Sequence, residues 1–295
     1  MTESISGPIT EVHDDDLVQA LLPPSLQVER DGADVAVLRL TRAAKRNALD
    51  DPTVLGIEAF FATPPSWAKA VVLDADGEHF SAGLDLSELT ERNAFAGLEH
   101  SMMWHRAFER LERGRVPVVA VLKGAVIGGG LELASAAHIR VAEPSAFYAL
   151  PEGQRGLFVG GGASVRLPRL IGAHRMADMM LTGRVLDAEE GQALGLSHYL
   201  TDAGEGLGQA LELARRIAAN SPVTNFAVLQ ALPRIAEANP AEGYLMESLM
   251  AAVASGSGEA KERMRAFLQG RAGKVGRTGG WQPAERAEPA GWEER

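Results

Sequence analysis

The sequence predicts an α/β fold in which parallel strands are layered with helices. Between residues 70 and 200, short apolar runs rich in β-branched residues alternate with helical patterns, which is typical of parallel sheets. Glycine-rich turns follow several of these runs, as expected where a strand leads into a helix. From residue 206 onward the pattern is helical only, which predicts a separate C-terminal helical region.

The elements follow from hydrophobic periodicity and from the residues that interrupt it. An acidic arm precedes a β-hairpin whose strands flank Asp31-Gly32, and a basic loop then leads to the first long helix. Strands are expected at residues 26–29, 35–40, 70–73, 116–122, 139–142, 146–149 and 197–200. Helices are expected at residues 51–61, 94–113, 175–181, 188–194, 206–219, 222–236, 240–254 and 258–269. Another helix opens after residues 160–162, and Pro168 is expected to bend or break it.

This pattern divides the chain into four parts. Residues 1–25 form the N-terminal arm, and residues 26–204 form the core that holds the active site. Residues 205–271 form the helical region. Residues 272–295 are rich in glycine, proline and charge, and we expect them to be a flexible tail.

The length, net charge and cysteine content of the chain exclude several classes of protein function. The chain has 295 residues, enough for a sizeable core, and a net charge of -10, which argues against nucleic acid or an anionic membrane as a partner. It has no cysteine, so thiolate catalysis and cysteine-bound metals are excluded, and a cytoplasmic location is expected. The longest apolar run, residues 116–122, is too short to span a bilayer.

The chain is organised around residues 124–134, where an apolar run leads into Gly128-Gly129-Gly130 and then into a helical pattern. Glycine lets a ligand approach main-chain N–H groups closely, and the first N–H groups of a helix lack internal partners. Together these features can bind a developing negative oxygen. A glycine-rich turn that only packs against a neighbour gives the same pattern.

A second stretch of the same character, residues 81–85, also follows a strand. If the two loops lie at adjacent ends of parallel strands, the N–H groups of Leu84 and Gly129 can both donate to one thioester oxygen. Such an oxyanion hole would hold the enolate that forms when charge moves onto that oxygen.

An enolate needs proton transfer, and Glu132 and Glu152 are the candidates. Glu132 lies four residues beyond the first glycine, and Glu152 opens the turn after the strand at 146–149. Two carboxylates in a partly dry pocket raise one another's pKa, so one can hold a proton while the other stays ionised. Either glutamate alone can also be a solvated carboxylate in a first helical turn.

These motifs resemble those of the enoyl-CoA hydratase/isomerase (crotonase) superfamily. The matching stretches are Phe80 to Asp85, Ile127 to Leu133 and Leu150-Pro151-Glu152, with Lys45 to Leu49 earlier in the chain. The resemblance covers residues 26–271 and implies a spiral ββα core followed by a C-terminal helical trimerisation region. It also implies a coenzyme A thioester as substrate, no further cofactor, and a homotrimer or dimer of trimers.

The resemblance assigns residues to roles. Leu84 and Gly129 match the oxyanion-hole donors, Glu132 the water-activating carboxylate, and Glu152 the proton donor to the α-carbon. The positions implied to contact coenzyme A are Lys45, Arg46, Ala82, Asp85, Phe267 and Arg271. The positions expected to line the acyl pocket are Met103, Trp104 and Phe158. Two positions depart from the family pattern: the proline expected two or three residues before Lys45-Arg46 is missing, and Gly270 replaces an expected lysine.

The presence of both Glu132 and Glu152 favours, among the reactions of this superfamily, the hydration of an α,β-unsaturated acyl-CoA. Isomerisation, thioester hydrolysis and retro-aldol cleavage are the alternatives within the superfamily, and a non-catalytic acyl-CoA-binding subunit is the alternative of another class. The spacing of His100 and His105 does not suit a metal site. Gly160-Gly161-Gly162 lacks the rest of a dinucleotide or P-loop motif, and Arg155 and Arg166 receive no role.

Overall fold

The computed structural model describes residues 18–88, 91, 93–276 and 280–282. The chain forms two compact units, Met1–Asn225 and Phe226–Arg295. Of the predicted N-terminal arm, residues 1–17 lie outside the described residues. No helix in the described ranges combines the length and the apolar character that crossing a membrane requires.

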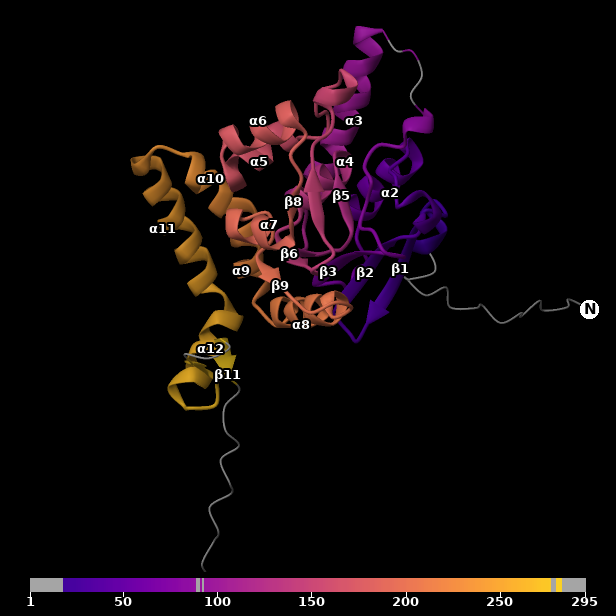
Figure 1. Cartoon of the computed structure of the whole chain (residues 1–295). Helices are drawn as coiled ribbons and strands as arrows, with labels where there is room; N and C mark the ends of the chain where they lie inside the picture. The colour runs from indigo at the N-terminus through magenta and orange to yellow at the C-terminus, as the bar shows by residue number, and fades with distance from the viewer. Residues whose placement is uncertain (1–17, 89–90, 92, 277–279, 283–295) are drawn as a thin grey trace, which may run out of the picture. The chain divides into compact units, whose positions relative to one another are not determined.

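A six-stranded sheet forms the centre of the first unit, in the order β1-β2-β3-β4-β6-β9 (Figure 1). The predicted hairpin of β1 and β2 is antiparallel, and the other neighbours are parallel, which confirms the α/β prediction. The strands are β1 (Leu26–Asp31), β2 (Val35–Leu40), β3 (Ala70–Ala75), β4 (Val118–Leu122), β6 (Ile139–Ala142) and β9 (Tyr199–Leu200).

A second sheet contains β5 (Ala125–Ile127), β7 (Phe147–Ala149) and β8 (Leu186–Asp187). The chain passes from β4 to β5 and from β6 to β7 before it enters a helix. In these two passages the chain places one strand in each sheet before a helix, which is the predicted ββα spiral. The strands expected from the sequence do not include β5, which lies inside the glycine-rich stretch 124–134, or β8, which has two residues.

The first unit also contains the following α-helices. They are α2 (Asp51–Ala62), α3 (Ala94–Glu112), α4 (Gly129–Ala136), α5 (Ala163–Ile171), α6 (Ala173–Thr182), α7 (Ala188–Leu194), α8 (Gly206–Ala218) and α9 (Pro222–Phe226). The helix was expected to bend or break near Pro168; α5 continues through this residue and ends at Ile171. A proline removes one backbone hydrogen bond, whereas Gly172, at φ 82°, is in a conformation that ends the helix.

Apolar side chains cover both faces of the larger sheet. Alternate residues of each strand point to opposite faces, so Leu38 and Leu73 join the core beneath α2, α3 and α4. On the other face, Val37 and Val72 pack against Ala214 and its neighbours on α8 (Figure 1). The sequence placed α8 in the C-terminal helical region, but this packing makes it part of the first unit, which extends to Asn225.

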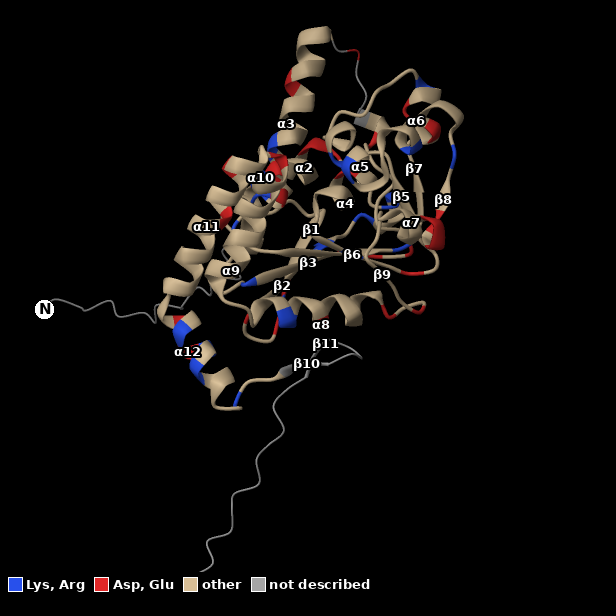
Figure 2. Ribbon diagram, turned by 90° about the vertical axis from the view of Figure 1, so that its left-hand side faces the viewer, with Lys and Arg blue, Asp and Glu red and all other residues tan. Residues whose placement is uncertain are grey.

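The second unit is mainly helical. A π-helical turn, Ala227–Ala231, is followed by α10 (Leu232–Glu237), α11 (Pro240–Gly256) and α12 (Gly258–Leu268), which carries several Lys and Arg residues (Figure 2). The chain continues into an antiparallel hairpin of β10 (Lys274–Gly276) and β11 (Gly280–Gln282). This hairpin falls within the expected flexible tail at 272–295, of which residues 277–279 and 283–295 lie outside the described residues.

Candidate active site

The two predicted glycine loops meet in the structure. Ser81 pairs with Val126 as an isolated bridge, and the N–H of Ile127 donates to the carbonyl of Ser81 at 3.1 Å. Gly83 has φ +84°, and a Cβ there would lie 2.9 Å from the amide nitrogen of Gly129. Only glycine allows both this backbone conformation and this close approach.

The main-chain N–H groups of Leu84 and Gly129 lie side by side. A Cβ added to Gly129 would be 3.2 Å from the Leu84 nitrogen. Gly129 is the first residue of α4, so its N–H has no partner within the helix. Among the described residues, neither amide donates a hydrogen bond, and both residues line the same cavity.

This cavity has a volume of about 470 Å³, within the usual range for small-molecule sites. It also contains both predicted glutamates, so the structure brings together the four residues proposed for catalysis. The lining residues are Leu84, Leu86, Gly97, His100, Ser101, Trp104, Gly129, Glu132, Glu152, Arg155, Leu157, Phe158, Val159, Gly160 and Gly161.

Glu132 is buried in the first turn of α4, with 4% of its surface exposed. Its Oε1 accepts hydrogen bonds from the N–H groups of Gly161, at 2.7 Å, and Ala163, at 3.0 Å. Burial raises the pKa of Glu132, while these two hydrogen bonds oppose the increase. The carboxyl group is therefore held in place while its affinity for a proton is increased.

Glu152 follows β7 and faces the turn before α4. Its Oε1 lies 2.6 Å from the position of a Cβ on Gly128, whose φ of +51° also requires glycine. Its buried Oε2 has no hydrogen-bond partner among the described residues. Burial raises the pKa of Glu152, and the nearby Glu132 carboxylate raises it further. Each of the two carboxyl groups therefore binds a proton more readily than an exposed glutamate does.

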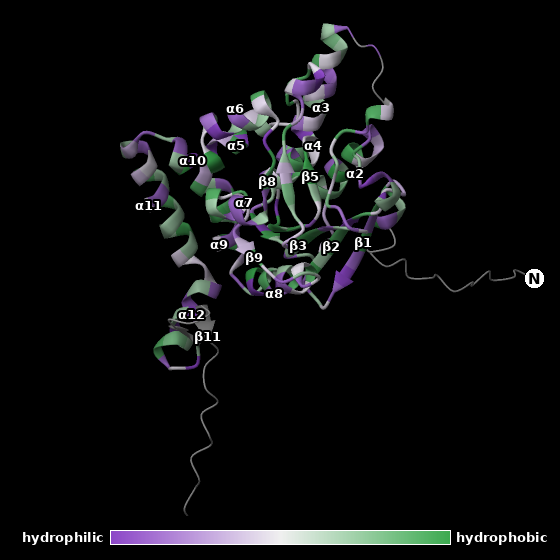
Figure 3. Ribbon diagram, in the orientation of Figure 1, coloured by the Kyte–Doolittle hydropathy of each residue, from purple (hydrophilic) through white to green (hydrophobic). Residues whose placement is uncertain are grey.

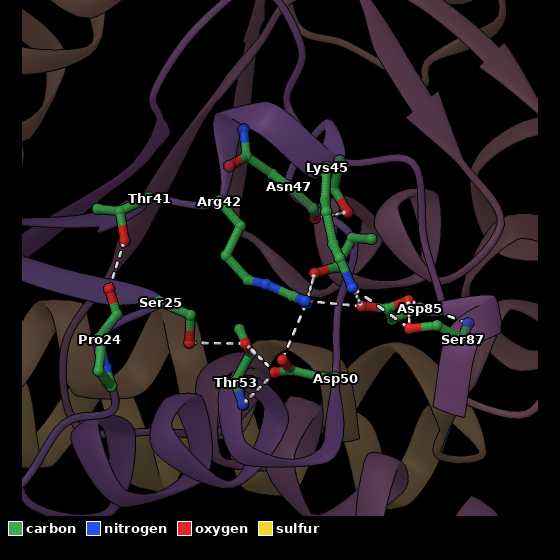
Figure 4. Close-up of polar contacts among 12 residues, drawn as sticks. Pro24, Ser25, Thr41, Arg42, Lys45, Asn47, Asp50, Thr53, Asp85 and Ser87 are labelled. Carbon is green, nitrogen blue, oxygen red and sulfur yellow. Dashed lines mark hydrogen bonds and ion pairs between the residues drawn. The ribbon is translucent and has the colours of Figure 1, made fainter. Parts of the chain in front are cut away.

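The predicted coenzyme A loop is held by an ion-pair cluster (Figure 4). The Asp85 carboxylate lies 2.7 Å from the Arg42 guanidinium and 3.0 Å from the Lys45 ammonium. It also accepts hydrogen bonds from the Ser87 hydroxyl, at 2.6 Å, and the Ser87 N–H, at 3.1 Å. Asp85 was expected to contact coenzyme A. In the structure its buried carboxylate forms the ion pairs and hydrogen bonds that stabilise the loop.

Asp85→Asn is expected to lower the free energy of unfolding by about 2 kcal/mol at pH 7, because it removes one partner of a buried charge cluster. The hydrogen bonds from Ser87 and Lys45 hold the pKa of Asp85 well below its usual range. This stabilisation is present above the unfolded-state pKa, about 3.9, and is lost as pH falls towards the lower folded-state value.

Urea unfolding at pH 7 and near pH 3 measures this effect. Asp202→Asn, at an exposed aspartate, is the matched control. An equal stability difference at both pH values would contradict the assigned role of Asp85.

The other predicted coenzyme A residues differ in their surroundings. Arg46 is exposed, has φ 51°, and makes no side-chain ion pair with another described residue. The N–H of Ala82 donates to the Arg46 carbonyl at 2.9 Å, which joins the two loops. Phe267 and Arg271 belong to the second unit, where Phe267 is exposed and Arg271 contacts Gln269. Their contact with coenzyme A stays a prediction.

Of the residues predicted to line the acyl pocket, Trp104 and Phe158 line the cavity, and Met103 does not. α3 presents Gly97, His100, Ser101 and Trp104 to the cavity, at the spacing of one helical face. Met103 points away from this face and packs against the apolar core.

Sequence reasoning missed the donors that hold Glu132. Three glycines, Gly160 to Gly162, stand just before α5, and this signal predicts free N–H groups at a helix N-terminus. Arg166, which received no role, lies 2.8 Å from Glu112 and donates to the Gly161 carbonyl, so it fixes this loop. The described residues contain no metal-binding cluster of three or more His, Asp or Glu residues.

The fold and the cavity bring two free main-chain amides and two carboxyl groups together, an arrangement that is chemically able to bind a carbonyl oxygen and to move protons. A family model described as enoyl-CoA hydratase/isomerase matches residues 30–274. The chain belongs to this family, as the sequence motifs indicated.

Relatives and solved structures agree with this assignment. The chain is 30% identical over 247 residues to a short-chain-enoyl-CoA hydratase of Clostridium acetobutylicum, covering 83% of this chain and 94% of the relative. It is also 30% identical over 241 residues to a 2,3-dehydroadipyl-CoA hydratase of Escherichia coli, covering 80% and 93%. A solved structure from Rhodopseudomonas palustris, provisionally described as an enoyl-CoA hydratase, is 61% identical with a TM-score of 0.82, covering 84% and 96%. The predicted hydratase branch is thereby confirmed.

Proposed function

We propose that the protein adds water across the double bond of an α,β-unsaturated acyl-CoA. The observation that carries this proposal is the meeting of two free main-chain amides and two carboxyl groups in one cavity. In this proposal, Leu84 and Gly129 donate to the thioester oxygen. Each such donor contributes ~100- to 1000-fold to the rate.

The proton transfers are assigned to the glutamates. Glu132 accepts a proton from water as the water oxygen bonds to the β-carbon, and the electron pair of the double bond moves into an enolate at the thioester. Glu152 then gives its proton to the α-carbon, and the enolate collapses to the saturated 3-hydroxyacyl-CoA. The raised pKa of both carboxyl groups supports these roles, because it brings them nearer to neutral pH.

Loss of the enoyl-thioester absorbance of crotonyl-CoA and longer enoyl-CoA thioesters tests the proposal. Water addition is established by the 3-hydroxyacyl-CoA product, identified by mass spectrometry. A double-bond isomer, free coenzyme A or a cleaved acyl group would instead identify one of the alternative reactions. Tight binding of these thioesters without turnover would identify a non-catalytic acyl-CoA-binding subunit.

We further propose that the enzyme acts in the cytoplasm as a homotrimer or a dimer of trimers. The exposed apolar side chains of α11 support self-association, because water-exposed rows of this kind are commonly covered by a partner (Figure 3). They are Tyr244, Leu245, Leu249 and Val253. Light scattering coupled to size-exclusion chromatography tests the assembly, and a monomeric mass would contradict it.

A further inference from the structure

One charged residue of the cavity has no part in the proposed hydration. Arg155 lines the cavity together with the catalytic groups. It ends the short turn Gly153–Arg155, where its N–H donates to the Glu152 carbonyl at 3.0 Å. The N–H of Leu157 donates to the same carbonyl at 2.9 Å, with Gly156 at φ 69° between them. This tight turn keeps the Arg155 backbone close to Glu152.

The Arg155 side chain makes no hydrogen bond or ion pair with another described residue. Two other polar side chains of the cavity wall already have partners. The Ser101 hydroxyl donates to the Gly160 carbonyl at 2.7 Å, and the His100 ring lies 2.7 Å from the Asp51 carboxylate. The guanidinium of Arg155 therefore keeps its donors available to a molecule in the cavity.

The wall around Arg155 is otherwise largely apolar, with Leu86, Leu157 and Phe158. Arg155 is an exposed residue. A guanidinium presents a planar set of N–H donors that matches a carboxylate, and such charge-assisted bonds are stronger than those between neutral groups. A purely hydrocarbon acyl chain offers this group no partner. An acyl chain with its own carboxylate offers both a matching charge and a matching geometry.

We infer that the acyl group of the substrate carries a second carboxylate, which Arg155 binds. The inference rests on the proposed hydration and specifies its substrate class as the CoA thioester of an unsaturated dicarboxylic acid. The apolar side chains contact the methylene groups between the thioester and that carboxylate. Arg155 is then a specificity-determining residue of the enzyme.

Arg155 also lowers the pKa of Glu152 through its charge, against the effects of burial and Glu132. This second influence acts on every substrate equally, whereas recognition of a carboxylate acts only on substrates that carry one. The two effects therefore separate when matched substrates are compared.

The experiment measures kcat/KM for pairs of trans-2-enoyl-CoA thioesters with chains of four to eight carbons. Within each pair, the terminal group is either methyl or carboxylate. The wild-type enzyme is expected to prefer the carboxylate at one or more chain lengths. Arg155→Gln is expected to lower the carboxylate-to-methyl ratio of kcat/KM by ~10- to 100-fold, and Arg155→Lys by less, because lysine keeps the charge.

Arg110→Gln, at an exposed arginine of α3 outside the cavity lining, is the control and should leave the ratio unchanged. Thermal unfolding checks that each variant folds. A wild-type preference for methyl at every length, or an equal loss for both members of a pair in Arg155→Gln, would overturn the inference. Hydration of neither member by the wild-type enzyme would instead overturn the proposed function.

Discussion

Glu132→Gln and Glu152→Gln are each expected to lower kcat for enoyl-CoA hydration at least ~100-fold, because each removes a group that accepts or gives a proton. Glutamine keeps the size of the side chain. At position 132 its oxygen can still accept the hydrogen bonds that Gly161 and Ala163 now donate to the carboxylate. Steady-state kinetics over a range of pH values measures the loss.

The stability of Glu132→Gln separates lost chemistry from lost folding. Burial raises the pKa of Glu132 in the folded protein, so ionisation at neutral pH opposes folding. The stabilising effect of this group is fully present below its unfolded-state pKa and is lost as pH rises through the folded-state pKa. Removing the charge should therefore leave the melting temperature unchanged or higher at pH 8, with a smaller difference near pH 4.

Two results would contradict the assignment of the glutamates. One is near wild-type turnover in either variant, measured with pure protein to exclude contaminating activity. The other is an inactive variant that is unfolded at pH 8, because the activity loss would then report on stability alone. Glu78→Gln, outside this cavity, is a suitable control and should keep full activity.

Gly129→Pro is expected to lower kcat by ~100- to 1000-fold, because proline has no N–H to donate to the thioester oxygen. Proline suits the backbone here, because Gly129 is the first residue of α4. Its added carbon atoms, however, also crowd the Trp104 ring, which would lie 2.7 Å from a Cβ at this position.

Gly129→Ala is the matched variant for this test. It introduces the same Cβ and the same crowding of Trp104, but it keeps the N–H. The ratio of kcat between the alanine and proline variants therefore reports on the N–H itself. Equal activity in these two variants, with both folded, would exclude Gly129 as an oxyanion donor.

The larger elements and the residues that meet in the cavity could be predicted from the sequence because both leave local patterns. Buried parallel strands such as β3 appear as continuous apolar runs, and turns that bring amides near a ligand require glycine. The order of strand, glycine and glutamate in residues 124–134 was therefore enough to place Gly129 and Glu132 in one site.

The expectations that differ from the structure concern side chains and helices whose position depends on residues distant in the sequence. Met103 and Trp104 are adjacent, and only the packing of α3 decides which of them faces the cavity. Asp85 looks like a ligand-binding residue until Arg42 and Lys45 are seen to surround it. α8 appears as one more C-terminal helix, and only its fit against the sheet shows that it belongs to the first unit.

The two hydrogen bonds to Glu132 constrain how this active site can change over evolution. The segment from Glu152 to Ala163 is fixed at both ends. Glu152 supplies one carboxyl group of the cavity, and the N–H of Ala163 donates to the other carboxyl group, that of Glu132. An insertion or deletion within it would displace one of the two. New substrate preferences must therefore arise by exchanging side chains along a segment of constant length, and position 155 is where such an exchange has the greatest scope.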